Sequence, residues 1–115
     1  MRLISLLVMF LAFAQMAEAQ DWISSMKNIP LAPGLKEVPD QGSVMEGPLG
    51  PIIIVYARGD GPADKVRGFY DETLPAMGWE KQGNKWRHES LLLALDFVGT
   101  GRDPVIVTFT LHGSK

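Results

Sequence analysis

Two histidines, His88 and His112, are the side chains of this sequence best suited to acid–base or metal chemistry near neutral pH. Each lies in or at the end of a stretch with the alternation of a β-strand, so we expect both on a solvated face. The nearest hydroxyls along the chain are Ser90 and Ser114, and neither has the sequence context of an activated nucleophile. The pattern therefore predicts no catalytic residue, no metal site and no cofactor.

The charged residues do not supply a reaction centre either. Asp71 and Glu72 are adjacent on an expected helix, where neighbouring side chains diverge, so they do not form an acid–base pair. Residues 99–102 could bind an anion with backbone amides, but such a loop between strands is more typical of a wide turn. The 11 Lys and Arg residues are scattered among 13 Asp and Glu residues, which disfavours a nucleic-acid partner.

One amphipathic helix, within residues 61–79, is the element around which we expect the fold to form. At 100° per residue, six side chains fall on one face, and most charged side chains fall opposite. The apolar face comprises Val66, Phe69, Tyr70, Thr73, Leu74 and Met77.

The sequence also predicts where this helix begins and ends. Pro62 suits the first helical position, because its missing N–H would have no partner there. Gly78 can adopt the left-handed conformation that ends a helix, so that Trp79 folds back onto Leu74. Pro75 predicts a kink or a tightened last turn.

Strands are expected on both sides of the helix, at residues 51–58, 80–82, 85–88, 90–97 and 105–111. The first is apolar in both phases of its alternation, so we expect a central strand that is covered on both faces, or partly covered by the N-terminal arm. The order β-α-β-β-β-β predicts an α+β fold, with a single helix packed on an antiparallel sheet.

Residues 20–50 are rich in proline and glycine and precede this α+β domain, residues 51–115. We expect an extended arm packed on the domain, with one or two short edge strands and a short helical turn at residues 22–27. The alternative is a disordered tether, which would normally contain fewer apolar residues than this segment does.

The N-terminus has the features of a secretory leader. Arg2 precedes an apolar run that ends in Ala17-Glu18-Ala19, which matches a signal peptide of residues 1–19 cleaved after Ala19. The apolar run is shorter than a membrane-spanning helix needs, so a retained anchor is the less favoured alternative. We expect a periplasmic or secreted protein with no stable membrane span after cleavage. The absence of cysteine excludes disulfides and leaves stability to the core.

The motif Phe-Tyr-x-x-x-Leu-Pro-x-x-Gly-Trp at residues 69–79 resembles that of a group of small bacterial exported domains of unknown function. The approach at residues 30–35 is also similar to theirs. The resemblance covers residues 29–111 and implies the strand–helix–meander fold. It implies no catalytic residue, because the motif residues are structural.

The charged face of the helix is the predicted interaction surface. Asp64, Arg67 and Asp71 have the spacing of a solvated ion-pair ladder. Gly68 lies among them, where Ala would favour the helix more, so this glycine is either neutral or leaves room for a docked backbone.

Two functions are compatible with these features. The first is a non-catalytic interaction or structural module of the cell envelope, with an unidentified envelope protein as its partner. The alternative is a periplasmic small-molecule-binding domain with a pocket between arm and sheet, lined by Trp22, Tyr56 and Trp86. A deep cavity with converging polar groups would favour the second, and a filled core with an exposed apolar patch the first.

Overall fold

A computed structural model describes residues 21–99 and 104–114 of the chain. These residues form, in chain order, β1 (Asp21–Ile23), β2 (Met26–Leu31), β3 (Lys36–Glu37), β4 (Ser43–Gly47), β5 (Gly50–Gly59), α2 (Ala63–Ala76), β6 (Glu80–Gln82), β7 (Lys85–His88), β8 (Leu91–Val98) and β9 (Val105–Gly113). The expected leader, residues 1–19, and most of the glycine-rich loop lie outside the described residues.

Seven of these strands form one antiparallel sheet with the order β3-β5-β9-β8-β7-β6, and β4 lies beside β3 on the same edge of β5. Strands β1 and β2 pair only with each other. The α+β class is confirmed, and the strand–helix–four-strand succession from β5 to β9 follows the expected order. The full order differs, because four further strands precede β5.

The main correction concerns residues 20–50. The predicted helical turn at residues 22–27 is wrong: β1 and β2 form a hairpin, with Ser24 and Ser25 in its turn. Strands β3 and β4 are short edge strands, as expected. Proline and glycine exclude a long helix here, but they allow short strands that pair on one side only.

Helix α2 matches its predicted apolar face, with Val66, Tyr70 and Leu74 buried. It begins at Ala63, one residue later than expected, and Pro62 is the N-cap. The C-terminal end is as predicted. The amide of Trp79 donates to the carbonyl of Leu74 at 3.0 Å, and Gly78 has a φ of 95°.

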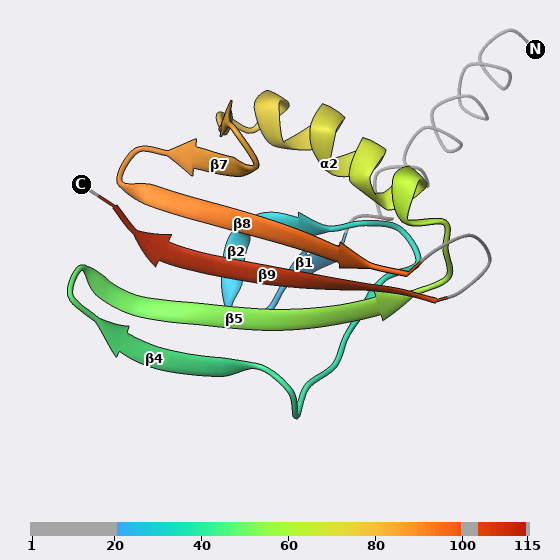
Figure 1. The fold of residues 1–115 in the computed structure, drawn as a ribbon, viewed down its shortest axis with the longest axis horizontal. Helices are drawn as coiled ribbons and strands as arrows, with labels where there is room; N and C mark the ends of the chain where they lie inside the picture. The colour runs from blue at the N-terminus through green and yellow to red at the C-terminus, as the bar shows by residue number, and fades with distance from the viewer. Residues whose placement is uncertain (1–20, 100–103, 115) are drawn as a thin grey trace, which may run out of the picture.

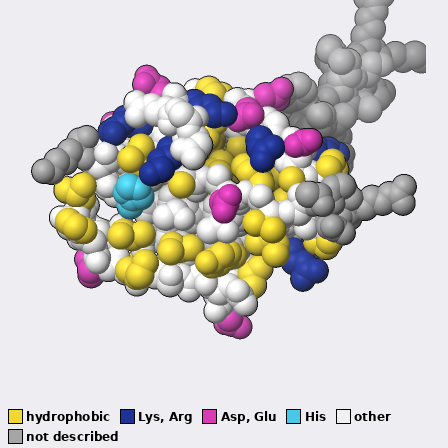
Figure 2. All heavy atoms as spheres, in the orientation of Figure 1, with side chains coloured by type: hydrophobic (Ala, Val, Ile, Leu, Met, Phe, Trp, Pro, Cys, Tyr) yellow, Lys and Arg dark blue, Asp and Glu magenta, His cyan; other side chains and the backbone are white. Residues whose placement is uncertain are grey.

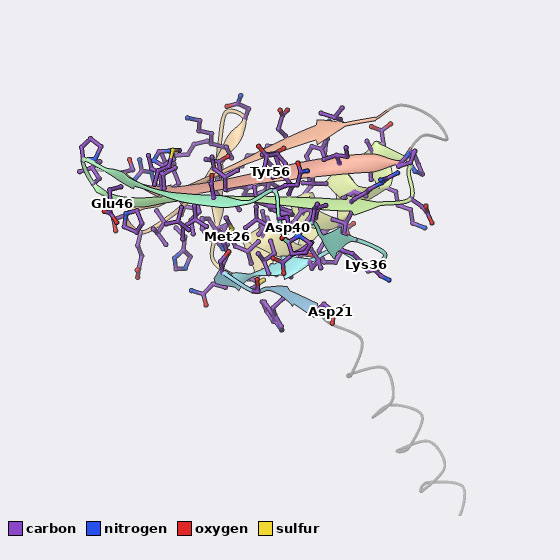
Figure 3. The ribbon with its side chains drawn as sticks, turned by 90° about the horizontal axis from the view of Figure 1, so that it is seen from below. Asp21, Met26, Lys36, Asp40, Glu46 and Tyr56 are labelled. Carbon is purple, nitrogen blue, oxygen red and sulfur yellow. The ribbon has the colours of Figure 1, made fainter. Side chains whose placement is uncertain are left out.

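The molecule has two layers. Helix α2 and the β1–β2 hairpin both pack on one face of the large sheet, which we call the inner face. Figure 3 shows the hairpin as a layer on one side of the sheet, with Tyr56 on the other side. The buried core lies between these layers and includes Ile23, Ile29, Leu74, Leu93, Val107 and Phe109.

The Tyr70 side chain joins the helix, the arm and the sheet. Its hydroxyl donates to the carbonyl of Pro30 at 2.9 Å and accepts from the amide of Ala32 at 3.1 Å. Its ring meets that of Phe109 edge to face, with centroids 5.6 Å apart. Burial raises the pKa of this phenol well above its usual value, so the hydroxyl keeps its proton and remains a donor.

Replacing Tyr70 by Phe should lower the free energy of unfolding by about 1–3 kcal/mol, because a carbonyl and an amide of the arm lose their buried partner. Urea denaturation of the variant measures this change. Ser25→Ala is the control, because it removes an exposed hydroxyl and should leave the free energy of unfolding nearly unchanged. Equal stability of Tyr70→Phe and the unmodified chain would contradict the role given to this hydroxyl.

Candidate interaction surface

No described helix or strand covers the second face of the large sheet, which we call the outer face. Side chains alternate along each strand, so the neighbours of the buried residues Val55, Leu93 and Val107 point outward. The outer face consists of the β5 row (Ile52, Ile54, Tyr56, Arg58), the β9 row (Ile106, Thr108, Thr110, His112) and the β8 row (Leu92, Ala94, Asp96, Val98), with Ser43 and Met45 on β4 and Lys85 and Arg87 on β7.

Apolar side chains are numerous on this face. Figure 2 shows a row of hydrophobic side chains that follows β5 across the molecule. At the margins Met45, Ile106 and Val98 are 49, 40 and 57% exposed, and in the middle Ile52 and Ile54 are half-buried. Strand β5 is central, as expected, and the arm hairpin shares the core with its buried residues. Cover on both faces is wrong for the described residues, since α2 and the hairpin lie on the inner face only, and partial cover by the arm is the expectation that holds.

The three rows of the outer face differ in chemistry. The β5 row carries three large side chains and ends at Arg58, while the β8 row contains the small Ala94 and the acidic Asp96. Between them, Thr108 is paired with Tyr56 on one side and with Asp96 on the other. Arg58 and Asp96 are exposed, and neither forms an ion pair within residues 21–99 and 104–114.

The predicted surface on α2 is exposed, and its charges are paired. Arg67 bonds Asp64 at 3.2 Å, and its guanidinium lies over the ring of Phe97. Asp71 pairs with Lys81 of β6 at 3.4 Å rather than with Arg67. A Cβ at Gly68 would meet nothing within 4 Å, so no described backbone of this chain docks there.

The three aromatic residues expected around a pocket do not come together. Trp22 lies on the hairpin with 47% of its surface exposed, and Trp86 is buried in the core. Tyr56 belongs to the outer face, on the opposite side of the sheet from Trp86, because it alternates with the buried Val55 and Ala57.

A different cleft does lie between arm and sheet. It has a volume of about 460 Å³, and its lining includes Ser24, Glu37, Ser43 and Ile53. The carboxylate of Glu37 already accepts bonds from the amide and hydroxyl of Ser24, at 3.0 and 2.9 Å. The charged group of this cleft is therefore already bonded to a neighbouring serine.

A second cleft, of about 350 Å³, lies beside α2 and is lined in part by Arg67, Asp71, Lys81 and Trp86. Three of its charged residues, Arg67, Asp71 and Lys81, belong to the ion pairs already described, and the fourth, Asp96, has no ion-pair partner among the described residues. Lys81 lies 5.4 Å from the centre of the Trp86 ring, so the cation is held by both an acid and an aromatic ring.

The histidines lie apart. His88 is half-buried, with its ring 5.2 Å from that of Trp79, so it packs at the end of α2 instead of facing solvent as expected. His112 belongs to the outer face, and its Nδ1 lies 2.8 Å from the carbonyl of Gly113. No group of three or more His, Asp or Glu side chains gathers as a metal site in the part of the chain that is described.

Comparison with known proteins adds no relative. No family model matches the chain, and neither a curated protein nor a solved structure is significantly similar to it. Among the described residues, no helix has both the length and the apolar character needed to cross a bilayer.

Replacing Gly68 by Ala should raise the free energy of unfolding by about 0.5–1 kcal/mol, because alanine favours a helix and the new methyl group meets no neighbour. Thermal or urea unfolding of purified protein measures the gain. Gly59→Ala is the contrasting variant: its Cβ would lie 2.7 Å from the carbonyl oxygen of Gly34, so it should destabilise the fold. A destabilised Gly68→Ala protein would mean that the helix surface is not free.

Proposed function

We propose that this chain is a non-catalytic protein-interaction module of the cell envelope, and that the outer face is its docking surface. The observation that carries the proposal is the one-sided cover of the sheet. Helix α2 and the hairpin protect the inner face, while Ile52, Ile54 and Ile106 remain on the other. Soluble monomers rarely expose large contiguous apolar patches, and a patch edged by polar groups is typical of a binding surface.

Export is part of the same proposal. The apolar run and the Ala17-Glu18-Ala19 site support a leader of residues 1–19, and the mature chain would act in the periplasm or outside the cell. A domain without cysteine needs no oxidation in that compartment.

The competing function, small-molecule binding, has weaker support. The cleft between arm and sheet is large enough for a ligand, but a binding site also needs polar groups aimed at the ligand. Here the charged group, Glu37, is already bonded to Ser24. The interaction surface accounts for the exposed apolar residues, which the cleft does not explain.

A photoreactive amino acid at Thr108 tests the docking surface. Thr108 lies in the middle row of the outer face, so a bound protein should cover it and form an adduct on illumination of intact cells. The matched control carries the same amino acid at Gly68, on the exposed face of α2, where we expect little or no adduct. Adduct yields at Thr108 no higher than at Gly68 would contradict the proposal.

A further inference from the structure

We propose that the protein docked on the outer face is a second copy of this chain, packed face to face about a two-fold axis parallel to β9. This inference rests on the proposed function, because it specifies the partner of the same surface. Three observations lead to it: the size of the face, the complementarity of its rows, and the position of its charges.

The outer face is large enough for a dimer. Strands β4, β5, β9, β8 and β7 have 5, 10, 9, 8 and 4 residues. At about 3.3 Å per residue and about 4.8 Å between strands, these residues give a footprint of roughly 570 Å² per copy. Two such footprints come close to the lower end of the area buried in stable specific interfaces, about 1,200 Å². Two sheets packed in this way form an aligned sandwich, a common arrangement for paired sheets.

The rows of the face are complementary under this symmetry. In a two-fold dimer the same patch contacts itself, so an axis along β9 places the β9 row on its own copy and the β5 row on the β8 row. The pairing register then sets Ile54 opposite Ala94, because both are paired with Thr110 within one chain. A large side chain thus meets a small one.

The two charges nearest the middle of the face, Arg58 and Asp96, favour the same axis, while Lys85 and Arg87 lie at the margin, opposite β4 of the other copy. Tyr56 and Asp96 share Thr108 as their neighbour, so Tyr56 of one copy faces Asp96 of the other, with Arg58 next along the row. The phenol can donate to the carboxylate, and Arg58 supplies an opposite charge nearby. An axis across the strands would instead place Asp96 on Ala94 and Arg58 on Ile52, which leaves both charges buried without a partner.

Sedimentation of the chain, produced with its leader and purified after processing, tests the dimer. We expect a mass of twice the chain in the unmodified protein.

Asp96→Arg should raise the dimer dissociation constant about 100-fold, because Arg58 and the new arginine then repel each other across the interface. The double variant Arg58→Asp/Asp96→Arg should recover most of this loss, since the two charges are exchanged. Glu72→Arg, on the exposed side of α2, is the charge-matched control and should remain dimeric.

A second measurement does not depend on charge. The chain contains no cysteine, so Thr110→Cys introduces a single thiol on the β9 row, close to the proposed axis. A short bis-maleimide should join two copies of this variant and should not join two copies of Gly68→Cys.

The outcomes separate this inference from the proposed function. A dimer that survives Asp96→Arg, or one that Gly68→Cys crosslinks as well as Thr110→Cys, would overturn the proposed packing. A monomer at all concentrations, combined with a photo-adduct at Thr108 to a different protein, would overturn the second copy and leave the docking surface standing. A monomer with no adduct at Thr108 would overturn both.

Discussion

The buried hydroxyl of Tyr70 imposes the constraint on which the rest of the structure depends. A phenol in an apolar core must have hydrogen-bond partners, and here these partners are the backbone groups of Pro30 and Ala32 in the arm. The arm therefore packs against α2, and Ile23, Ile29 and Leu31 of the hairpin join the core. The same burial raises the pKa of the phenol, because the charged form would lose its hydration.

This arrangement also explains why the sheet is covered on one side. Helix α2 and the hairpin lie over adjacent parts of the inner face (Figure 1), and within the described residues no element is left for the outer face. The outer rows keep the side chains of a half-buried sheet, with isoleucines on β5 and threonines on β9. The proposed interaction follows from this imbalance rather than from any group suited to catalysis.

Much of the fold could be predicted from local chemistry. The end of α2 follows from Gly78, which can take a positive φ, and from Trp79, whose amide returns to Leu74. The strands after the helix follow from alternation, and β6 and β7 meet at the expected turn, where Gly83 has a φ of 65°.

Features that depend on distant contacts could not be predicted in this way. Pro30 argues against a strand, yet it lies in β2. Proline is tolerated there because β2 pairs with β1 only. The carbonyl of Pro30 accepts a hydrogen bond from Tyr70, which is 40 residues away. The sequence shows that both faces of β5 carry apolar side chains. It does not show whether the second face is covered by another part of this chain or by another molecule. The packing of His88 on Trp79 likewise depends on where the helix ends relative to β7.

The most direct test of this account is the folding of residues 51–115 without the arm. If the arm is an integral layer of the core, this fragment loses the hairpin side chains and both partners of the Tyr70 hydroxyl. We predict that circular dichroism of the fragment shows no cooperative thermal transition, whereas residues 20–115 unfold in a single step. A fragment that unfolds cooperatively, with stability close to that of the longer chain, would contradict the central role given to the Tyr70 contact.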